Sequence, residues 1–282
     1  MMKKALKIAA LIVAIVLIVG VCVFANGLVG NPISKAIAKN TAEKHLEENF
    51  ADKDFEIERV FYSFKDGFYH AFIYSPSSID TSFTVIVDMW GNLRYDTYED
   101  RVLTGRNTAD RINGDYREAV DKVLDSQAFP YNEHIGYGDF KFYPRAHLEQ
   151  YSVPEYALIT EDLTLDAFYD VNELAAKHGL LTIYIEDNIV TVERLSEILL
   201  DIKTVFDNAG VKFYMIDCVL EYPKLEDGKR REERVEVMSF LYTDIYEEGM
   251  EERVKASDEA ARAYYEEQDA EKFKEEVEET VN

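Results

Sequence analysis

The chain has 282 residues, of which 55 are acidic and 31 basic, so its formal net charge is −24. Residues 1–30 hold three of the bases and no acid, which leaves 28 bases against 55 acids, a net −27, for the rest. A surface this acidic repels polyanions and excludes nucleic acid as a partner. Hydrophobic residues make up 47% of the chain, enough to build two packed domains.

An uncharged apolar run from Ile8 to Ala25 follows Lys3, Lys4 and Lys7. A helix of roughly 20 such residues crosses a bilayer core about 30 Å thick. Lysines before the run, with none just after it, keep the N-terminus in the cytoplasm. The sequence therefore predicts a single-pass signal anchor that contacts lipid through residues 8–29 and places everything after residue 30 outside the cell.

Two other fates of this segment compete with the anchor. A signal peptide can be cleaved after Ala25, although the apolar run exceeds the roughly 7–15 residues usual for one. Lipidation at Cys22 is disfavoured because Val21 stands where a lipoprotein signal carries a small residue. Cys22 and Cys218 cannot pair within one chain, and an exported protein without an internal disulfide is typical of a Gram-positive envelope.

The first predicted domain covers residues 31–128. Asn31-Pro32 indicates the start of a helix that continues to residue 50. Strands on either side of Asp66-Gly67 form a hairpin, and further strands cover residues 81–87 and 93–96. A two-residue loop at Asp66-Gly67 pairs Val60 with Ile73 and gathers one apolar face. A helix over residues 108–124 closes the domain.

Residues 129–145 mix prolines, glycines and aromatics without periodicity, which predicts an ordered connector. The second domain, residues 146–282, contains a strand at 156–159, a helix at 171–178 and a strand at 180–185. A helix capped by Thr191 and ended by Gly210 follows. Strands 211–222 and 234–242 form a hairpin around Asp227-Gly228, and an acidic helix begins near Ser257. The expected fold class is α+β, with two small domains built on antiparallel sheets.

Common catalytic and cofactor motifs are missing from the sequence. It contains no GxxxxGK[ST], GxGxxG, GxSxG or HExxH pattern. A zinc site assembled by folding is a minor alternative, because the five histidines are far apart in the chain: His45, His70, His134, His147 and His178. We therefore assign no catalytic, cofactor-binding or metal-binding residue.

Three polar groupings have a bland interpretation and a functional alternative. The first is an acidic series without glycine, which favours solvated charge over a calcium loop: Glu161, Asp162, Asp166, Asp170 and Glu173. The second is a hydroxyl-rich loop, which favours turn formation over a polar binding site: Ser75-Pro76-Ser77-Ser78-Ile79-Asp80-Thr81. The third is a basic group, which favours internal ion pairs over an anionic ligand: Arg101, Arg106, Asn107 and Arg111.

Several short motifs together resemble the YfjL-like family of membrane-anchored proteins from Gram-positive bacteria. They are the apolar span with Asn31-Pro32, Tyr62-Ser63-Phe64-Lys65-Asp66-Gly67, Ser75-Pro76, Asp80-Thr81, Tyr98-Glu99, Asn107-Thr108 and Arg111. The resemblance covers residues 1 to about 125, and the second domain only in the order of its elements. It implies a first domain similar to cystatin-like or PepSY-like modules, and it implies no activity.

The leading functional hypothesis is a non-catalytic envelope module that binds a peptide or protein, or supports a membrane complex. Exposed sheet edges that accept an added strand are the physical basis for it. Two alternatives are an envelope hydrolase that uses paired carboxylates and a scaffold component of a conjugation or secretion apparatus.

Overall fold

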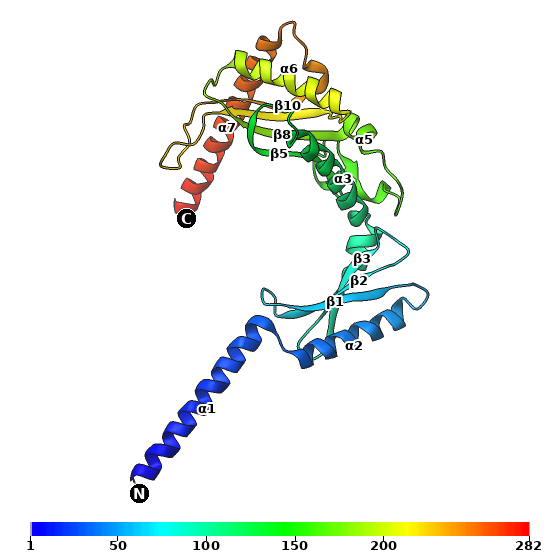
Figure 1. Cartoon of the computed structure of the whole chain (residues 1–282), viewed down its shortest axis with the longest axis vertical. Helices are drawn as coiled ribbons and strands as arrows, with labels where there is room; N and C mark the ends of the chain where they lie inside the picture. Colours follow the sequence, from blue (N-terminus) through cyan, green and yellow to red (C-terminus); the bar gives the residue numbers. More distant parts are fainter. Residues whose placement is uncertain (1, 282) are drawn as a thin grey trace. The chain divides into compact units, whose positions relative to one another are not determined.

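The computed structural model describes residues 2–281, except for the side chains of residues 2–10, 19, 22, 23, 26, 269 and 271–281. The chain forms two compact units. Unit 1 runs to Thr108 and also holds Leu163–Ala167, whereas unit 2 holds Ala109–Asp162 and the chain from Phe168 onward. The division between units therefore falls inside a helix rather than in the stretch at 129–145. Figure 1 shows the chain with many of its elements labelled, numbered in chain order.

Two helices open unit 1, α1 (Met2–Val29) and α2 (Pro32–Asn49), and they are separated at Gly30. Gly30 has a φ of +68°, and a Cβ there would lie 2.7 Å from Cβ of Tyr62. Both the backbone conformation and the lack of space therefore require glycine. The side chain of Asn31 caps α2 as predicted, because its Oδ1 accepts the Ser34 N–H at 2.7 Å.

Among the described residues, no helix combines the length and the apolar character that a membrane crossing requires. The predicted span at residues 8–29 falls partly on positions whose side chains lie outside the described residues.

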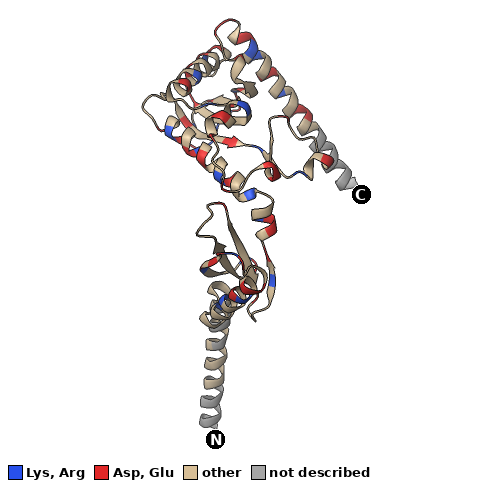
Figure 2. Cartoon of the chain, turned by 90° about the vertical axis from the view of Figure 1, so that its right-hand side faces the viewer, with Lys and Arg blue, Asp and Glu red and all other residues tan. Residues whose placement is uncertain are grey.

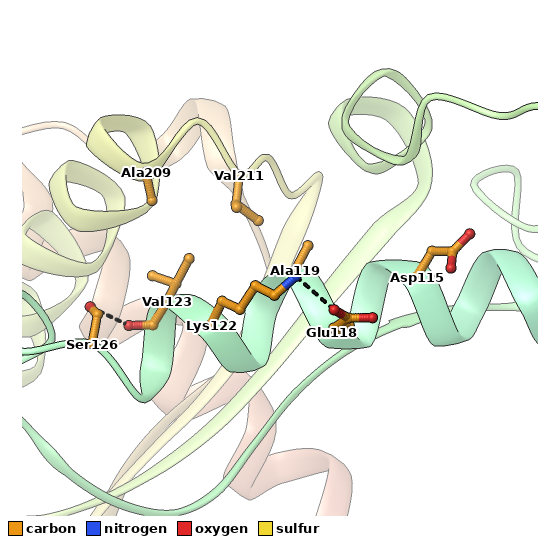
Figure 3. Close-up of a pocket in the computed structure, with 8 residues that line it drawn as sticks. All are labelled: Asp115, Glu118, Ala119, Lys122, Val123, Ser126, Ala209 and Val211. Carbon is orange, nitrogen blue, oxygen red and sulfur yellow. Dashed lines mark hydrogen bonds and ion pairs between the residues drawn. The ribbon is translucent and has the colours of Figure 1, made fainter.

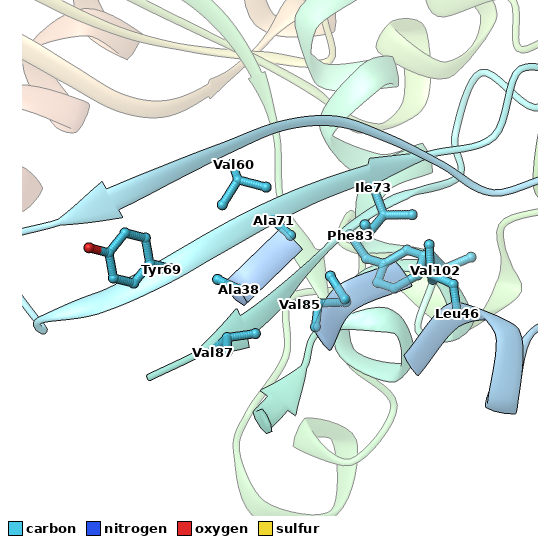
Figure 4. Close-up of a cluster of buried hydrophobic side chains, with 11 residues drawn as sticks. Ala38, Leu46, Val60, Tyr69, Ala71, Ile73, Phe83, Val85, Val87 and Val102 are labelled. Carbon is cyan, nitrogen blue, oxygen red and sulfur yellow. The ribbon is translucent and has the colours of Figure 1, made fainter. Parts of the chain in front are cut away.

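The sheet of unit 1 has four antiparallel strands in sequential order. They are β1 (Glu56–Ser63), β2 (Phe68–Tyr74), β3 (Ser82–Val87) and β4 (Leu93–Asp96). Helix α2 packs on one face of this sheet, and the side chains between them form a buried core (Figure 4). Ala38 and Ala42 of α2 are fully buried against β-branched and aromatic side chains of the strands. These small side chains let the helix lie close to the sheet. The predicted order of a helix followed by antiparallel strands is confirmed.

The predicted register of the first hairpin is wrong by two residues. Val60 pairs with Ala71, not with Ile73, because the loop spans Phe64 to Gly67 instead of two residues. The Gly67 N–H closes this loop by donating to the Ser63 carbonyl at 2.8 Å. Strand side chains alternate with a period of two, so a two-residue shift leaves every side chain on its predicted face.

A short π-helical turn (Glu99–Leu103) follows β4 and leads into α3 (Arg106–Leu124). The predicted helix at 108–124 is thus present and begins two positions earlier. Its first three residues belong to unit 1 and the remainder belongs to unit 2.

Unit 2 is built on a mixed sheet in the order β10-β9-β8-β5. The strands are β5 (Asn132–Phe140), β8 (Gly179–Glu186), β9 (Met215–Glu221) and β10 (Arg234–Leu241). A small parallel pair, β6 (Phe142–Tyr143) and β7 (Leu158–Ile159), stands beside it. The prediction of antiparallel pairing holds for β5–β8 and β9–β10. Strands β8 and β9 are instead parallel, because helix α6 (Val192–Ala209) returns the chain to the starting end of β8.

Strand β5 occupies most of the stretch predicted as a connector. Its glycines interrupt the alternation of side chains by which a strand is predicted from sequence. The packing of the strand explains why glycine stands at these positions. A Cβ at Gly138 would lie 2.6 Å from Val120 and 2.8 Å from Tyr116 of α3. The strand thus gives up the alternating side chains of a half-buried strand so that α3 can lie directly on it.

The second hairpin follows its predicted register near the turn, where Leu220 pairs with Val235 and Cys218 with Val237. A bulge between Val237 and Phe240 then shifts the pairing, so Leu241 faces Met215 rather than Tyr214. Two short helices, α4 (His147–Gln150) and α5 (Val171–His178), precede β8. The C-terminal helix α7 (Met250–Val281) begins before the predicted Ser257. The α+β class of both units is confirmed.

Candidate functional site

The hydroxyl-rich loop at residues 75–81 is held by contacts within unit 1. Ser75 Oγ donates to Asp54 Oδ1 at 2.6 Å, and the Ser77 N–H donates to Asp54 Oδ2 at 3.1 Å. The hydrogen bonds from Ser75 and Ser77 hold the pKa of Asp54 below its ordinary value. Ser78 Oγ and Thr81 Oγ1 share a hydrogen bond at 2.6 Å. The hydroxyls of the loop therefore form hydrogen bonds that stabilise its own conformation, which agrees with the turn interpretation.

Asp80 at the end of this loop is 1% exposed and is bound from two sides. Its Oδ2 accepts the Thr108 hydroxyl and the Asp166 N–H, both at 2.9 Å. Asp166 returns a bond, since its Oδ1 accepts the Asp80 N–H at 2.9 Å. Asp166 has a φ of +60°, which aspartate tolerates better than most residues. Asp166, a member of the acidic series, therefore has a structural role in unit 1, where it binds Asp80.

Other acids of that series form separate local contacts in unit 2. Asp170 caps α5 by accepting the N–H groups of Asn172 and Glu173. Glu161 and Asp162 both contact Arg145. Within the part of the chain that the structure describes, no three His, Cys, Asp or Glu side chains are grouped to hold a metal ion.

The predicted basic group forms internal contacts. Arg101 Nε donates to Asn107 Oδ1 at 2.9 Å, and Asn107 Nδ2 donates to the Ser82 carbonyl at 2.6 Å. The remaining two arginines pair with nearby acids, at 3.1 Å for Arg106–Asp100 and 3.8 Å for Arg111–Asp115. The ion-pair interpretation fits these distances.

Four of the five histidines have separate local partners. Two pair with carboxylates, one contacts a carbonyl and one packs on tyrosine rings: His45 on Asp96, His70 on Asp66, His178 on the Tyr156 carbonyl, and His147 between Tyr143 and Tyr151. The fifth, His134, lies between two glutamates of unit 2.

A shallow pocket of 420 Å³ lies in unit 2 between α3 and the chain that follows α6 (Figure 3). Its polar groups bind one another. Lys122 Nζ is 2.6 Å from Glu118 Oε1, and Ser126 Oγ donates to the Val123 carbonyl at 2.7 Å. With its charges paired along one helix, this pocket presents no convergent set of groups to a ligand.

A groove of 350 Å³ in unit 1 lies between α2 and the edge strand β1. Apolar atoms of Pro32, Ala36, Ile57 and Val60 form its floor and walls, with Val60 reaching into the core below (Figure 4). Lys35, Lys39, Glu58 and Arg59 also line the groove. No sequence motif marks this site, although the spacing of four between Lys35 and Lys39 places both on one helix face.

The cations of the groove are poorly neutralised. Lys39 Nζ lies 3.6 Å from Glu43, but neither Lys35 nor Arg59 forms an ion pair with any described residue. The Arg59 guanidinium instead lies 5.5 Å from the ring centroid of Phe72. The chain as a whole has 55 acidic and 31 basic residues, and Figure 2 shows both kinds distributed over its elements. Lys35 on α2 and Arg59 on the opposite face of β1 are therefore two cations without an ion pair to a described residue, one on each side of the same edge strand.

Strand β1 is an outer strand of its sheet, with β2 as its neighbour. Alternate backbone N–H and C=O groups of such a strand have no partner inside the sheet. A bulge between Ile57 and Arg59 interrupts its pairing beside the groove. Because of this bulge, Ile57 and Val60 both face α2 although they are three positions apart. Arg59 pairs with Phe72, so its side chain lies on the opposite face of the sheet, where its guanidinium contacts the Phe61 and Phe72 rings.

Comparison with known proteins found two family models. The YfjL-like N-terminal domain matches residues 3–98, and the YfjL-like C-terminal domain matches residues 115–255. No curated protein and no solved structure matched the chain. Because the two models together cover most of its length, the chain belongs to the YfjL-like family.

Proposed function

We propose that this protein is a membrane-anchored, non-catalytic binding module whose α2–β1 groove takes an extended, acidic segment of a partner protein. The observation that carries the proposal is the pair of cations without acidic ion-pair partners, Lys35 and Arg59, on the two sides of an edge strand that borders an apolar groove. The edge of β1 thus combines an apolar groove with positive charge on both sides of the strand, in a chain that is acidic as a whole.

Each part of the groove has a role in binding such a segment. The free backbone groups of β1 hydrogen-bond an added strand and supply affinity. The apolar surface of Ile57 and Val60 accepts a hydrophobic side chain of the segment. Lys35 and Arg59, on the two sides of the strand edge, attract carboxylates of the bound segment. This attraction favours acidic segments and speeds their association at low salt.

Membrane attachment is the second part of the proposal and is supported by the sequence. The lysine-flanked run at residues 8–29 is long enough to cross a bilayer and orients the chain with its N-terminus in the cytoplasm. On this proposal both units work on the outer face of the membrane. A Gram-positive envelope suits an exported unit 2 whose Cys218 is a buried, free thiol. No particular group of residues favours the hydrolase or the secretion scaffold.

Fluorescence anisotropy of the full chain in detergent micelles tests the binding. The probe is a labelled nine-residue peptide that alternates valine with glutamate, and the matched peptide alternates valine with lysine. We expect saturable binding of the glutamate peptide with a Kd on the order of 100 μM or tighter, and none of the lysine peptide.

Variants locate the site. Lys35→Glu combined with Arg59→Glu should weaken binding at least about tenfold, because it replaces two attractions by two repulsions. Lys44→Glu is the matched control, since Lys44 lies on α2 outside the groove and pairs with Glu48. Equal binding by the double variant and the parent chain would refute the groove, as would the failure of the glutamate peptide to bind.

A further inference from the structure

Four side chains of unit 2 meet at one end of its sheet. Glu186 ends β8 and Glu221 ends β9, and the parallel register pairs these two positions directly. His134 of the neighbouring strand β5 places Nε2 at 3.1 Å and Nδ1 at 4.0 Å from their respective carboxylates, Glu221 and Glu186. Arg230 reaches the same pair from the loop between β9 and β10.

His134 and Arg230 lie next to the same two carboxylate oxygens, Oε1 of Glu186 and Oε1 of Glu221. Oε1 of Glu186 lies 3.0 Å from Arg230 and is also the atom nearest His134. Oε1 of Glu221 contacts both Arg230 and His134. This oxygen and the contacting nitrogen of Arg230 are shielded from solvent and form no hydrogen bond of good geometry, so charge alone holds the contact. Poor screening strengthens any change of charge at this place.

The loop itself, residues 223–232, has few other attachments. Its backbone bonds join Leu225 with Lys229 and Gly228, and its other described polar contacts also stay inside it or reach the adjacent Tyr222. Residues 224–229 and 231–232 are exposed, whereas Arg230 is 24% exposed. Among the described contacts, the two ion pairs of Arg230 are the polar ties between this loop and the sheet.

We propose that His134, Glu186 and Glu221 form a proton-sensitive latch that holds the β9–β10 loop through Arg230 and loosens when His134 becomes protonated. With neutral His134, the guanidinium meets two carboxylates and no opposing charge. A protonated His134 competes with Arg230 for the same two oxygens, and its positive charge repels the guanidinium. By linkage, bound Arg230 and a proton on His134 oppose each other.

The remaining groups around His134 leave this competition in place. The ring of Tyr184 stands edge-on to the imidazole at 5.8 Å between centroids. Asn132 Nδ2 donates to Oε2 of Glu186 at 3.1 Å, so that carboxylate keeps its position when Arg230 leaves. Neither group adds charge at neutral pH.

Release of the loop changes a groove beside the latch. A groove of 560 Å³ lies at the carboxyl ends of β8 and β9, the edge where parallel strands commonly bind ligands. Glu186 and Pro223 both line it, so one wall comes from the latch and another from the first residue of the loop. The latch thereby couples the shape of this groove to pH.

A nitroxide spin label on the loop tests the latch in the full chain. The label is attached at Glu226→Cys in a Cys22→Ser background, where Cys218 stays buried. We expect the ratio of mobile to immobile label to rise on the order of tenfold between pH 7.5 and 5.0.

Three variants decide the outcome. His134→Gln should stay immobile at both pH values, and Arg230→Gln should be mobile at both. His147→Gln, the control, should keep the full step, because the His147 imidazole packs on the rings of Tyr143 and Tyr151, away from the latch residues. A label without a pH step in the parent chain would overturn the latch, and so would a step that persists in His134→Gln. Circular dichroism at both pH values confirms folding, and if Arg230→Gln fails to fold, His134→Gln decides alone.

Discussion

Asp80 and Asp166 lie 86 positions apart in the chain, and each carboxylate accepts the backbone N–H of the other at 2.9 Å. This reciprocal pair draws the Leu163–Ala167 segment into unit 1, although the chain on both sides of that segment belongs to unit 2. The pair is therefore part of what defines unit 1 as a folded body.

Asp166→Ala should destabilise unit 1 by about 2–4 kcal/mol. The change removes the acceptor for the Asp80 N–H and the Ser78 hydroxyl, and it places alanine at a φ of +60°. Urea unfolding followed by fluorescence of Trp90, the single tryptophan, reports on this unit.

Two companion variants separate the causes. Asp166→Gly should cost less than Asp166→Ala, because glycine accepts the backbone conformation while losing the same bonds. Asp162→Ala, at an exposed acid that pairs with Arg145, should change stability by less than about 0.5 kcal/mol. If Asp166→Ala unfolds like the parent chain, the pair contributes nothing to unit 1.

Gly138→Ala should destabilise unit 2 by about 1–3 kcal/mol, because the new Cβ would lie 2.6 Å from Val120 and 2.8 Å from Tyr116. Gly114→Ala on α3 is the matched control. Its Cβ meets nothing within 4 Å, so relief of backbone entropy should stabilise the helix by about 0.5–1 kcal/mol. Thermal unfolding followed by circular dichroism measures both, and a pair of shifts with the same sign would contradict the packing of α3 on β5.

Cys218 should lower the stability of unit 2 at alkaline pH. Burial raises the pKa of its thiol from 9.0 to about 12. A folded pKa above the unfolded one means that this contribution is complete below pH 9 and is lost as the pH rises toward 12. At pH 10.5 the loss should reach roughly 2 kcal/mol. Urea unfolding at pH 8 and 10.5 measures it.

Cys218→Val lacks the titrating group and serves as the reference. It should lose less stability over the same interval, while groups common to both chains, such as Tyr242 with a pKa raised to about 12, cancel. The thiol is fully buried, so a polar maleimide should label it slowly in the native chain. Fast labelling, or equal alkaline losses in the two chains, would disprove its burial.

Local signals account for the parts of the fold that the sequence predicts well. Asn31-Pro32 and the pair Thr191 and Gly210 mark helix ends through hydrogen bonds between near neighbours, and α2 and α6 begin where these signals place them. The face of each strand in the first hairpin is also predictable, because side chains alternate. The register is not, since a shift of two residues gives the same faces.

Features that depend on distant packing escape the sequence. The glycines of β5 resemble a loop until α3 is seen to lie on them. Asp166 belongs to an acidic run in sequence, but its partner Asp80 is in the other half of the chain. The groove escapes for the same reason: that Lys35 and Arg59 form no ion pair with a described residue is a property of the folded surface, not of either segment.

Backbone amide hydrogen exchange of the full chain, with and without the valine–glutamate peptide, tests the central claim most directly. If the peptide adds to the α2–β1 groove, exchange should slow several-fold in β1, around Ile57–Val60, because strand addition protects amides at a sheet edge. The opposite edge strand, β4, should exchange unchanged. Unaltered exchange in β1 at a saturating peptide concentration, or protection confined to β4, would contradict the proposal.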